Sequence, residues 1–143
     1  MKNLFGILVS STILLTSCGA QKGIVKGSLC YPSDYIPEMN VYLKNLDNNS
    51  IYLADVKEGQ KTFKIKKIIS GNYVAYAYTK EQIAQELDGT SLKASGGFTK
   101  AVDCGLTVNC NDHHLITFEV KKGKTTNSIR ICDWYGALVP KEK

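Results

Sequence analysis

Asp112, His113 and His114 are consecutive in the chain, and they are the side chains with the most obvious potential for chemistry. A carboxylate beside two imidazoles suits a Zn²⁺ or Cu²⁺ ion. In a strand, however, the two imidazoles would face opposite sides, which argues against both binding one ion. A site on this strand needs a third ligand, and Asp103 or Asp133 could come near only by folding. The alternative is structural, with Asp112 closing a turn and His113 hydrogen bonding within a sheet edge. We favour the structural role and keep a metal site as the alternative.

Trp134 and Tyr135 form an aromatic pair, and Trp134 is the single tryptophan of the chain. One interpretation is a core plug that closes the fold. The other is an exposed platform that, together with Phe98, stacks on a sugar ring or holds a peptide. We therefore expect the working surface to be residues 96–114 beside Trp134, binding a protein or glycan ligand.

The motifs of common enzymes are absent from the sequence. Ser95 precedes two glycines, but the Gly-x-Ser-x-Gly elbow of serine hydrolases does not occur. No glycine-rich phosphate loop precedes a helical pattern. Paired carboxylates such as Asp55 with Glu58 fall in predicted turns, where solvated charge explains them. We expect a protein that is not an enzyme and that carries no cofactor.

The N-terminal segment has the order of an export signal: Lys2, a short apolar stretch over residues 4–15, and small residues that lead to Cys18. The apolar stretch is shorter than the roughly 20 residues that a spanning helix needs. This order resembles a bacterial lipoprotein signal, which implies that residues 1–17 are removed and that Cys18 is acylated, for example with palmitate. Residues 18–23 would then be the lipidated cysteine and its tether. The implied location is the bacterial cell envelope, with the outer membrane favoured.

Four cysteines remain after Cys18, an even number that favours disulfides in an exported chain. Cys104 and Cys110 enclose a loop short enough to close easily, and their pairing leaves Cys30 with Cys132. Four cysteines nevertheless allow three connectivities, and the sequence leaves them open. A zinc site built from cysteines and histidines is disfavoured because no paired C-x-x-C spacing occurs.

The charge of the chain is mildly basic. The full chain carries a net charge of +5, and removal of Lys2 with the signal lowers it to +4. So mild an excess in an exported protein argues against a nucleic-acid partner. The lysines nevertheless cluster, and the clusters are Lys57, Lys61, Lys64, Lys66 and Lys67, followed by Lys121, Lys122 and Lys124. One interpretation is a solvated strand face whose charges prevent the edges of two sheets from pairing. The other is a patch that faces anionic lipid or an acidic polysaccharide.

The pattern of apolar residues predicts one all-β domain over residues 24–139, followed by a tail at 140–143. About seven short strands separated by turn signals are typical of an antiparallel β-sandwich. The strands are expected at residues 24–31, 39–46, 51–56, 62–68, 73–78, 115–120 and 129–131. Ile83 and Leu87, spaced at i and i+4, predict one short helical insertion over residues 81–87.

Two groups of motifs carry a resemblance to known proteins. The first group is Gly23-x-Val25-x-Gly27-x-Leu29, Tyr31-Pro32-Ser33 and Ile36-Pro37-x-Met39-x-Val41-Tyr42. It resembles bacterial carboxypeptidase-regulatory-like domains, which have the transthyretin-like (prealbumin-like) sandwich. Ser70 replaces the proline that usually precedes the glycine turn of that group, while Gly71 and Tyr73 match it. The resemblance implies a folding partner, spacer or binding module.

The second group is Gly96-Gly97-Phe98-Thr99-x-Ala101-Val102-x-Cys104-Gly105, Cys110-x-Asp112-His113 and Asp133-Trp134-Tyr135. It is similar to a subgroup of secreted bacterial proteins without an assigned activity. The positions of Cys30 and Cys132 are not usually cysteines in that subgroup. Their joint presence in this chain therefore supports pairing them.

Overall fold

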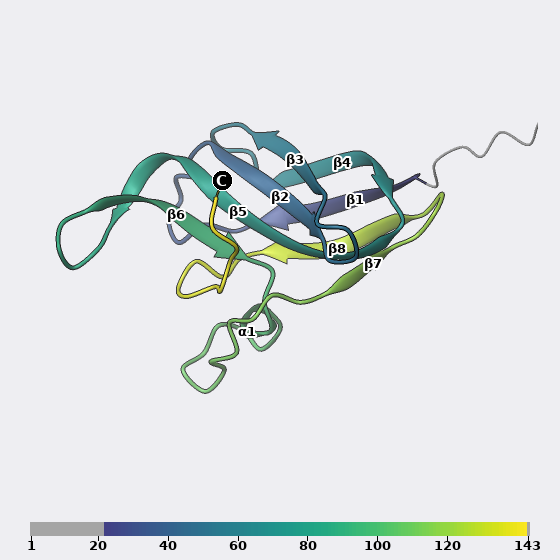
Figure 1. Cartoon of the computed structure of the whole chain (residues 1–143). Coiled ribbons are helices and arrows are strands. Elements are labelled where there is room, and N and C mark those ends of the chain that lie inside the picture. The colour runs from purple at the N-terminus through teal and green to yellow at the C-terminus, as the bar shows by residue number, and fades with distance from the viewer. Residues whose placement is uncertain (1–21, 143) are drawn as a thin grey trace, which may run out of the picture.

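The computed structural model describes residues 22–142, which form a β-sandwich of two sheets (Figure 1). The predicted signal and Cys18 lie outside the described residues. The elements are β1 (Lys22–Leu29), β2 (Met39–Asn45), β3 (Ile51–Val56), β4 (Thr62–Ile69), β5 (Gly71–Gln85), β6 (Ser91–Gly97), α1 (Lys100–Asp103), β7 (Phe118–Val120) and β8 (Thr125–Ile131). One sheet has the order β4-β1-β8, and the other has the order β3-β2-β5-β6 with β7 paired to the start of β5. No helix in the described part of the chain is long and apolar enough to span a bilayer.

The core lies between the two sheets and follows the alternation expected from the sequence. In β2, Met39, Val41 and Leu43 are fully buried, while the residues between them lie on the other face. In β4, Phe63 and Ile65 are buried and alternate with the exposed Thr62, Lys64 and Lys66. A strand with this period buries one face and leaves the other to solvent, and the all-β prediction is confirmed.

The smaller sheet contains the most distant pairing in the chain. β1 is its central strand, antiparallel to β4 and parallel to β8. Leu29 and Ile131 are partners at the end of the parallel pair. The next residue of each strand is a cysteine, and Cys30 and Cys132 form a disulfide. The other disulfide joins Cys104 to Cys110, so both expected pairs are present.

The helix expected at residues 81–87 is replaced by a strand. β5 continues to Gln85, and its second half pairs with β6 through partners such as Gln82 with Lys93. Ile83 and Leu87 are exposed, so a helix there would have had no apolar face to bury. Pairing with β6 satisfies the backbone in this segment. The short helix in the described part of the chain is α1, which no pattern in the sequence predicts.

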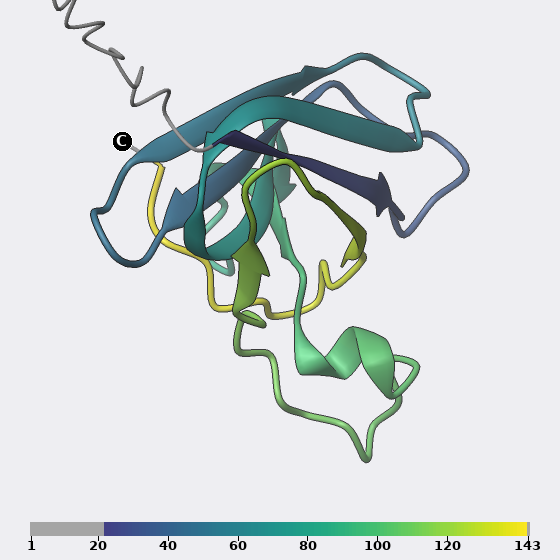
Figure 2. The same ribbon diagram turned by 90° about the vertical axis from the view of Figure 1, so that its right-hand side faces the viewer.

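Residues 98–117 leave the sandwich and return to it, carrying α1 and the Cys104–Cys110 loop (Figure 2). Their base is held by a bridge between Thr99 and Leu115 and by a hydrogen bond from the Ile116 amide to the Phe98 carbonyl. The strand expected at residues 115–120 is confined to β7, because the residues before Phe118 form this base.

Candidate functional site

Asp133 is fully buried where the chain leaves β8, and its carboxylate organises the candidate site. Its backbone exchanges two hydrogen bonds with Gly97 at the end of β6. Oδ2 accepts a hydrogen bond from the Thr99 hydroxyl at 2.8 Å, and Oδ1 accepts one from the Tyr135 amide at 3.2 Å. A buried carboxylate needs such partners, because an unpaired one is strongly destabilising.

His113 is the third partner of this carboxylate. Its Nδ1 lies 2.7 Å from Asp133 Oδ2, and its side chain is 28% exposed. Because a carboxylate only accepts hydrogen bonds, Nδ1 carries the proton in the neutral ring, and Nε2 is left as an acceptor. Within residues 22–142, Nε2 has no hydrogen-bond partner. The buried aspartate therefore fixes the histidine ring and leaves one nitrogen for a ligand.

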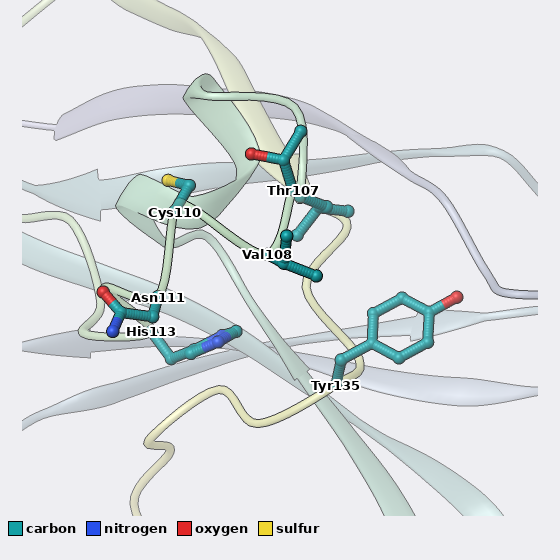
Figure 3. Close-up of a pocket in the computed structure, with 7 residues that line it drawn as sticks. Thr107, Val108, Cys110, Asn111, His113 and Tyr135 are labelled. Atoms are coloured by element: carbon teal, nitrogen blue, oxygen red, sulfur yellow. The ribbon is translucent and has the colours of Figure 1, made fainter.

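A pocket of about 290 Å³ adjoins this histidine. Its lining residues are Leu106, Thr107, Val108, Cys110, Asn111, His113 and Tyr135. His113 and Tyr135 enter it from separate segments, with Val108 between them in the view of Figure 3. Tyr135 is 69% exposed, so most of its ring surface is open to a ligand. The pocket thus combines an aromatic ring, apolar side chains, an amide, a hydroxyl and an imidazole.

The loop that forms one wall of the pocket is held by local contacts. The Cys104–Cys110 disulfide closes it, and the Leu106 amide donates to the Ala101 carbonyl at 2.8 Å. Gly105 has a φ of +81°, a left-handed conformation that favours glycine at the end of α1. Ala101 also donates to the carbonyl of Asp112 at 3.0 Å. The wall is therefore anchored to α1 at both ends.

Asp112 and His114 form a separate, exposed pair. Asp112 Oδ1 lies 2.8 Å from His114 Nδ1 and accepts a hydrogen bond from the His114 amide at 3.1 Å. These bonds, followed by that from Lys100, lower the pKa of Asp112 to about 2. His113 instead turns to Asp133, so the structure divides the three consecutive residues between two contacts. Within residues 22–142, no group of three His, Cys, Asp or Glu side chains is placed to hold a metal ion.

Trp134 and Phe98 lie away from the pocket lining. Trp134 packs partly buried against the core, donates from Nε1 to the Cys30 carbonyl, and meets the Tyr31 ring edge-on at 5.0 Å between centroids. Phe98 is 8% exposed and packs near Phe118. Of the three aromatic residues expected at the ligand surface, Tyr135 is the one that lines the pocket.

Sequence reasoning missed Thr99 as a partner of the site, and it offered Asp133 only as a possible metal ligand. The pocket residues Thr107, Val108 and Asn111 lie inside the expected surface of residues 96–114, but the sequence did not single them out. No local pattern marks the contacts of Asp133, because its partners Thr99 and His113 are 34 and 20 residues away in the sequence. The sequence gives only an indirect sign of the role of Asp133, which follows Cys132 directly at the end of an apolar strand.

Comparisons with protein-family models and with curated proteins find no match for this chain. Among solved structures, it is similar to part of a leucine-rich repeat protein from Bacteroides thetaiotaomicron VPI-5482, at 16% identity and a TM-score of 0.41. The match covers 80% of this chain and 14% of that chain, so this chain spans a small part of that protein's length. This similarity is too weak to assign a fold family, and the transthyretin-like resemblance stays a prediction.

Proposed function

We propose that this protein is a lipid-anchored binding module of the bacterial cell envelope, and that its pocket takes one sugar residue of a glycan. The observation that supports the proposal most is the His113 ring, which a buried aspartate fixes while Nε2 stays available beside the exposed Tyr135 ring. This combination suits a sugar, because a pyranose presents an apolar face to an aromatic ring and hydroxyls to imidazole and amide groups.

The size of the pocket favours a glycan over a protein ligand. A volume of about 290 Å³ is just below the range of small-ligand sites, which span roughly 300–1,000 Å³. A stable protein interface instead buries about 800 Å² on each partner and usually needs a broad, well-packed surface. A single ring fits the available space, and the rest of the glycan would continue outside the pocket.

The anchor part of the proposal depends on Cys18, which follows the predicted signal. Acylation of Cys18 would place the pocket on the envelope surface that carries its ligand. Cys18→Ala is expected to move the protein from the membrane fraction to the soluble fraction. Unchanged retention in the membrane would contradict the lipoprotein prediction.

A glycan array tests the pocket directly. The exported domain, residues 19–143, contains every core residue and both disulfides, so it is a suitable probe. Tyr135→Ala and His113→Ala should each weaken binding at least about tenfold, because residues at the centre of a small site dominate its affinity. The matched controls are Tyr35→Ala and His114→Ala, which remove an exposed tyrosine and an exposed histidine outside the pocket.

The array and the four variants together decide whether the pocket binds a glycan. Binding that is lost in the two pocket variants and kept in the two controls supports the proposal. An array without any bound glycan, or equal losses in the pocket and control variants, contradicts it. A glycan bound with no effect of Tyr135→Ala places its site elsewhere on the sandwich and also contradicts the proposal.

A further inference from the structure

The sheet β4-β1-β8 carries charge of one sign. Its three strands contain no aspartate or glutamate, and all six of their charged residues are exposed cations. We call these residues the basic face: Lys22, Lys26, Lys64, Lys66, Lys67 and Arg130. Among the described residues, none of the six forms an ion pair, whereas lysines of other elements do, such as Lys80 and Lys93. The outer face of this sheet is therefore strongly positive, although the net charge of the whole chain is mild.

The register of the sheet brings these charges together. Lys26 of β1 is directly opposite Lys64 of β4, and like charges in this position are unfavourable. A register shift in the same pair leaves Lys67 as an extra residue with a φ of +61°, so Lys66 and Lys67 are both exposed although they are consecutive. A left-handed lysine in a bulge also has a conformational cost. The strands thus concentrate cations where an uncharged polar residue would be more stable.

Protection of a sheet edge explains only part of this arrangement. Lysines on β4 can block pairing with another chain, because β4 is an edge strand. β1 lies between β4 and β8 and has no free edge. Lys26 lies in the middle of that strand and therefore has no such role. A cation in the centre of a positive sheet indicates an anionic partner for its outer face.

The position of the basic face relative to Cys18 indicates which partner this is. β1 begins at Lys22, four residues after Cys18, and four extended residues span at most about 14 Å. The turn before β8 lies beside the same end, where the Gly123 amide donates to the Lys22 carbonyl (Figure 1). That turn adds the exposed Lys122 and Lys124 to the positive surface. An acylated Cys18 would hold this end within a short distance of lipid headgroups.

We propose that the basic face lies against the anionic headgroups of the membrane in which Cys18 is anchored. The inference relies on the anchor part of the proposed function and adds a second, electrostatic contact to the lipid. The lipid would hold the N-terminal end of the domain at the bilayer, and each exposed cation of the basic face near an anionic surface would add about 1 kcal/mol of electrostatic attraction. This orientation would leave the larger sheet, on the other side of the sandwich, facing away from the bilayer.

Co-sedimentation with lipid vesicles tests the contact without the acyl chain. The domain of residues 19–143 is mixed with vesicles of phosphatidylcholine alone or with added phosphatidylglycerol. We expect binding only to the anionic vesicles, and we expect it to fall with increasing salt because ions screen exposed charges. The triple variant Lys26→Gln, Lys64→Gln, Lys66→Gln should bind about 100-fold more weakly, since each lysine near an anionic surface contributes about fivefold.

A second triple variant is the matched control. Lys44→Gln, Lys100→Gln and Lys141→Gln remove the same charge from β2, from α1 and from the segment after β8, and they should change binding much less. The first variant is expected to stay folded, because replacement of Lys26 or Lys64 removes a like-charge pair. Its urea midpoint should equal or exceed that of the wild type.

Three outcomes would overturn the proposal. They are no binding of the wild-type domain to anionic vesicles at low salt, equal losses in the two triple variants, and binding to a soluble acidic polysaccharide such as alginate but not to vesicles. The test is independent of acylation, because the domain lacks Cys18. Failure of the anchor would appear separately, as an unmodified Cys18 in the mass spectrum of the cellular protein.

Discussion

Removal of the Cys30–Cys132 disulfide should lower the stability of the domain more than removal of the Cys104–Cys110 disulfide. The first bridge spans 102 residues and the second spans 6. In the chain-entropy model, a loop of the first length restricts the unfolded chain by about 4.7 kcal/mol, and one of the second length by about 2 kcal/mol. The two variants are Cys30→Ala with Cys132→Ala, and Cys104→Ala with Cys110→Ala.

The native sheet explains why this loss should arise mainly in the unfolded state. Leu29 and Ile131 are already partners in β1 and β8, and the Cys30 amide donates to the Ile131 carbonyl at 3.1 Å. The two strands therefore stay adjacent without the bridge, while the unfolded chain gains all the freedom of the open loop. Burial of Cys132 adds a small packing loss when alanine replaces it.

Urea unfolding followed by the fluorescence of Trp134 measures both losses, provided that the transitions are two-state. We expect the free energy of unfolding to fall by about 4.7 kcal/mol for the long bridge and by about 2 kcal/mol for the short one. Equal losses, or a larger loss for the Cys104–Cys110 pair, would refute the reasoning. Two alkylatable cysteines in the wild-type domain would refute the bridges themselves.

Two further predictions concern packing and protonation. A Cβ at Gly96 would lie 2.6 Å from two atoms of the Trp134 indole, so Gly96→Ala should lower the free energy of unfolding by about 1–3 kcal/mol and shift the tryptophan emission. Burial, and then the hydrogen bond to Glu142, raise the pKa of Tyr42 to about 12. The stability from this protonated phenol should be complete below the ordinary pKa of 10.0 and lost as the pH rises through about 12. The difference between the ultraviolet titrations of wild type and Tyr42→Phe gives the pKa, and urea unfolding of both proteins over the same pH range measures the loss of stability.

Much of the fold could be predicted because strands leave a local pattern. The alternation around Val41 and around Phe63 fixed which face is buried, and the turns between these strands have typical residues. The parallel pairing of β1 with β8 has no local pattern, because it depends on which sheet each later strand joins. The prediction of a helix at residues 81–87 was wrong because it depended on the spacing of two apolar residues. That spacing does not show whether the fold offers a surface against which they can be buried.

The candidate site was less predictable for a related reason. Asp112, His113 and His114 are adjacent in the sequence, which suggested that they act together. In the structure, His114 contacts Asp112, while His113 contacts Asp133. His113 turns to Asp133 because the buried carboxylate needs donors that only distant segments provide. Phe98 looked suitable for an exposed platform, but it fills the core at the base of residues 98–117. The residue types in the sequence indicated residues 96–114 as the region of the site. Contacts between distant segments then determine which of these side chains line the pocket.

Titration of the domain with a panel of envelope monosaccharides, followed by amide and imidazole NMR shifts, tests the central claim most directly. We predict saturable shifts at the His113 ring, at Asn111 and at Tyr135, with the residues of the outer sheet faces unchanged. The absence of saturable shifts at these three residues, or shifts confined to the sheet faces, would contradict the proposal that this pocket binds a sugar.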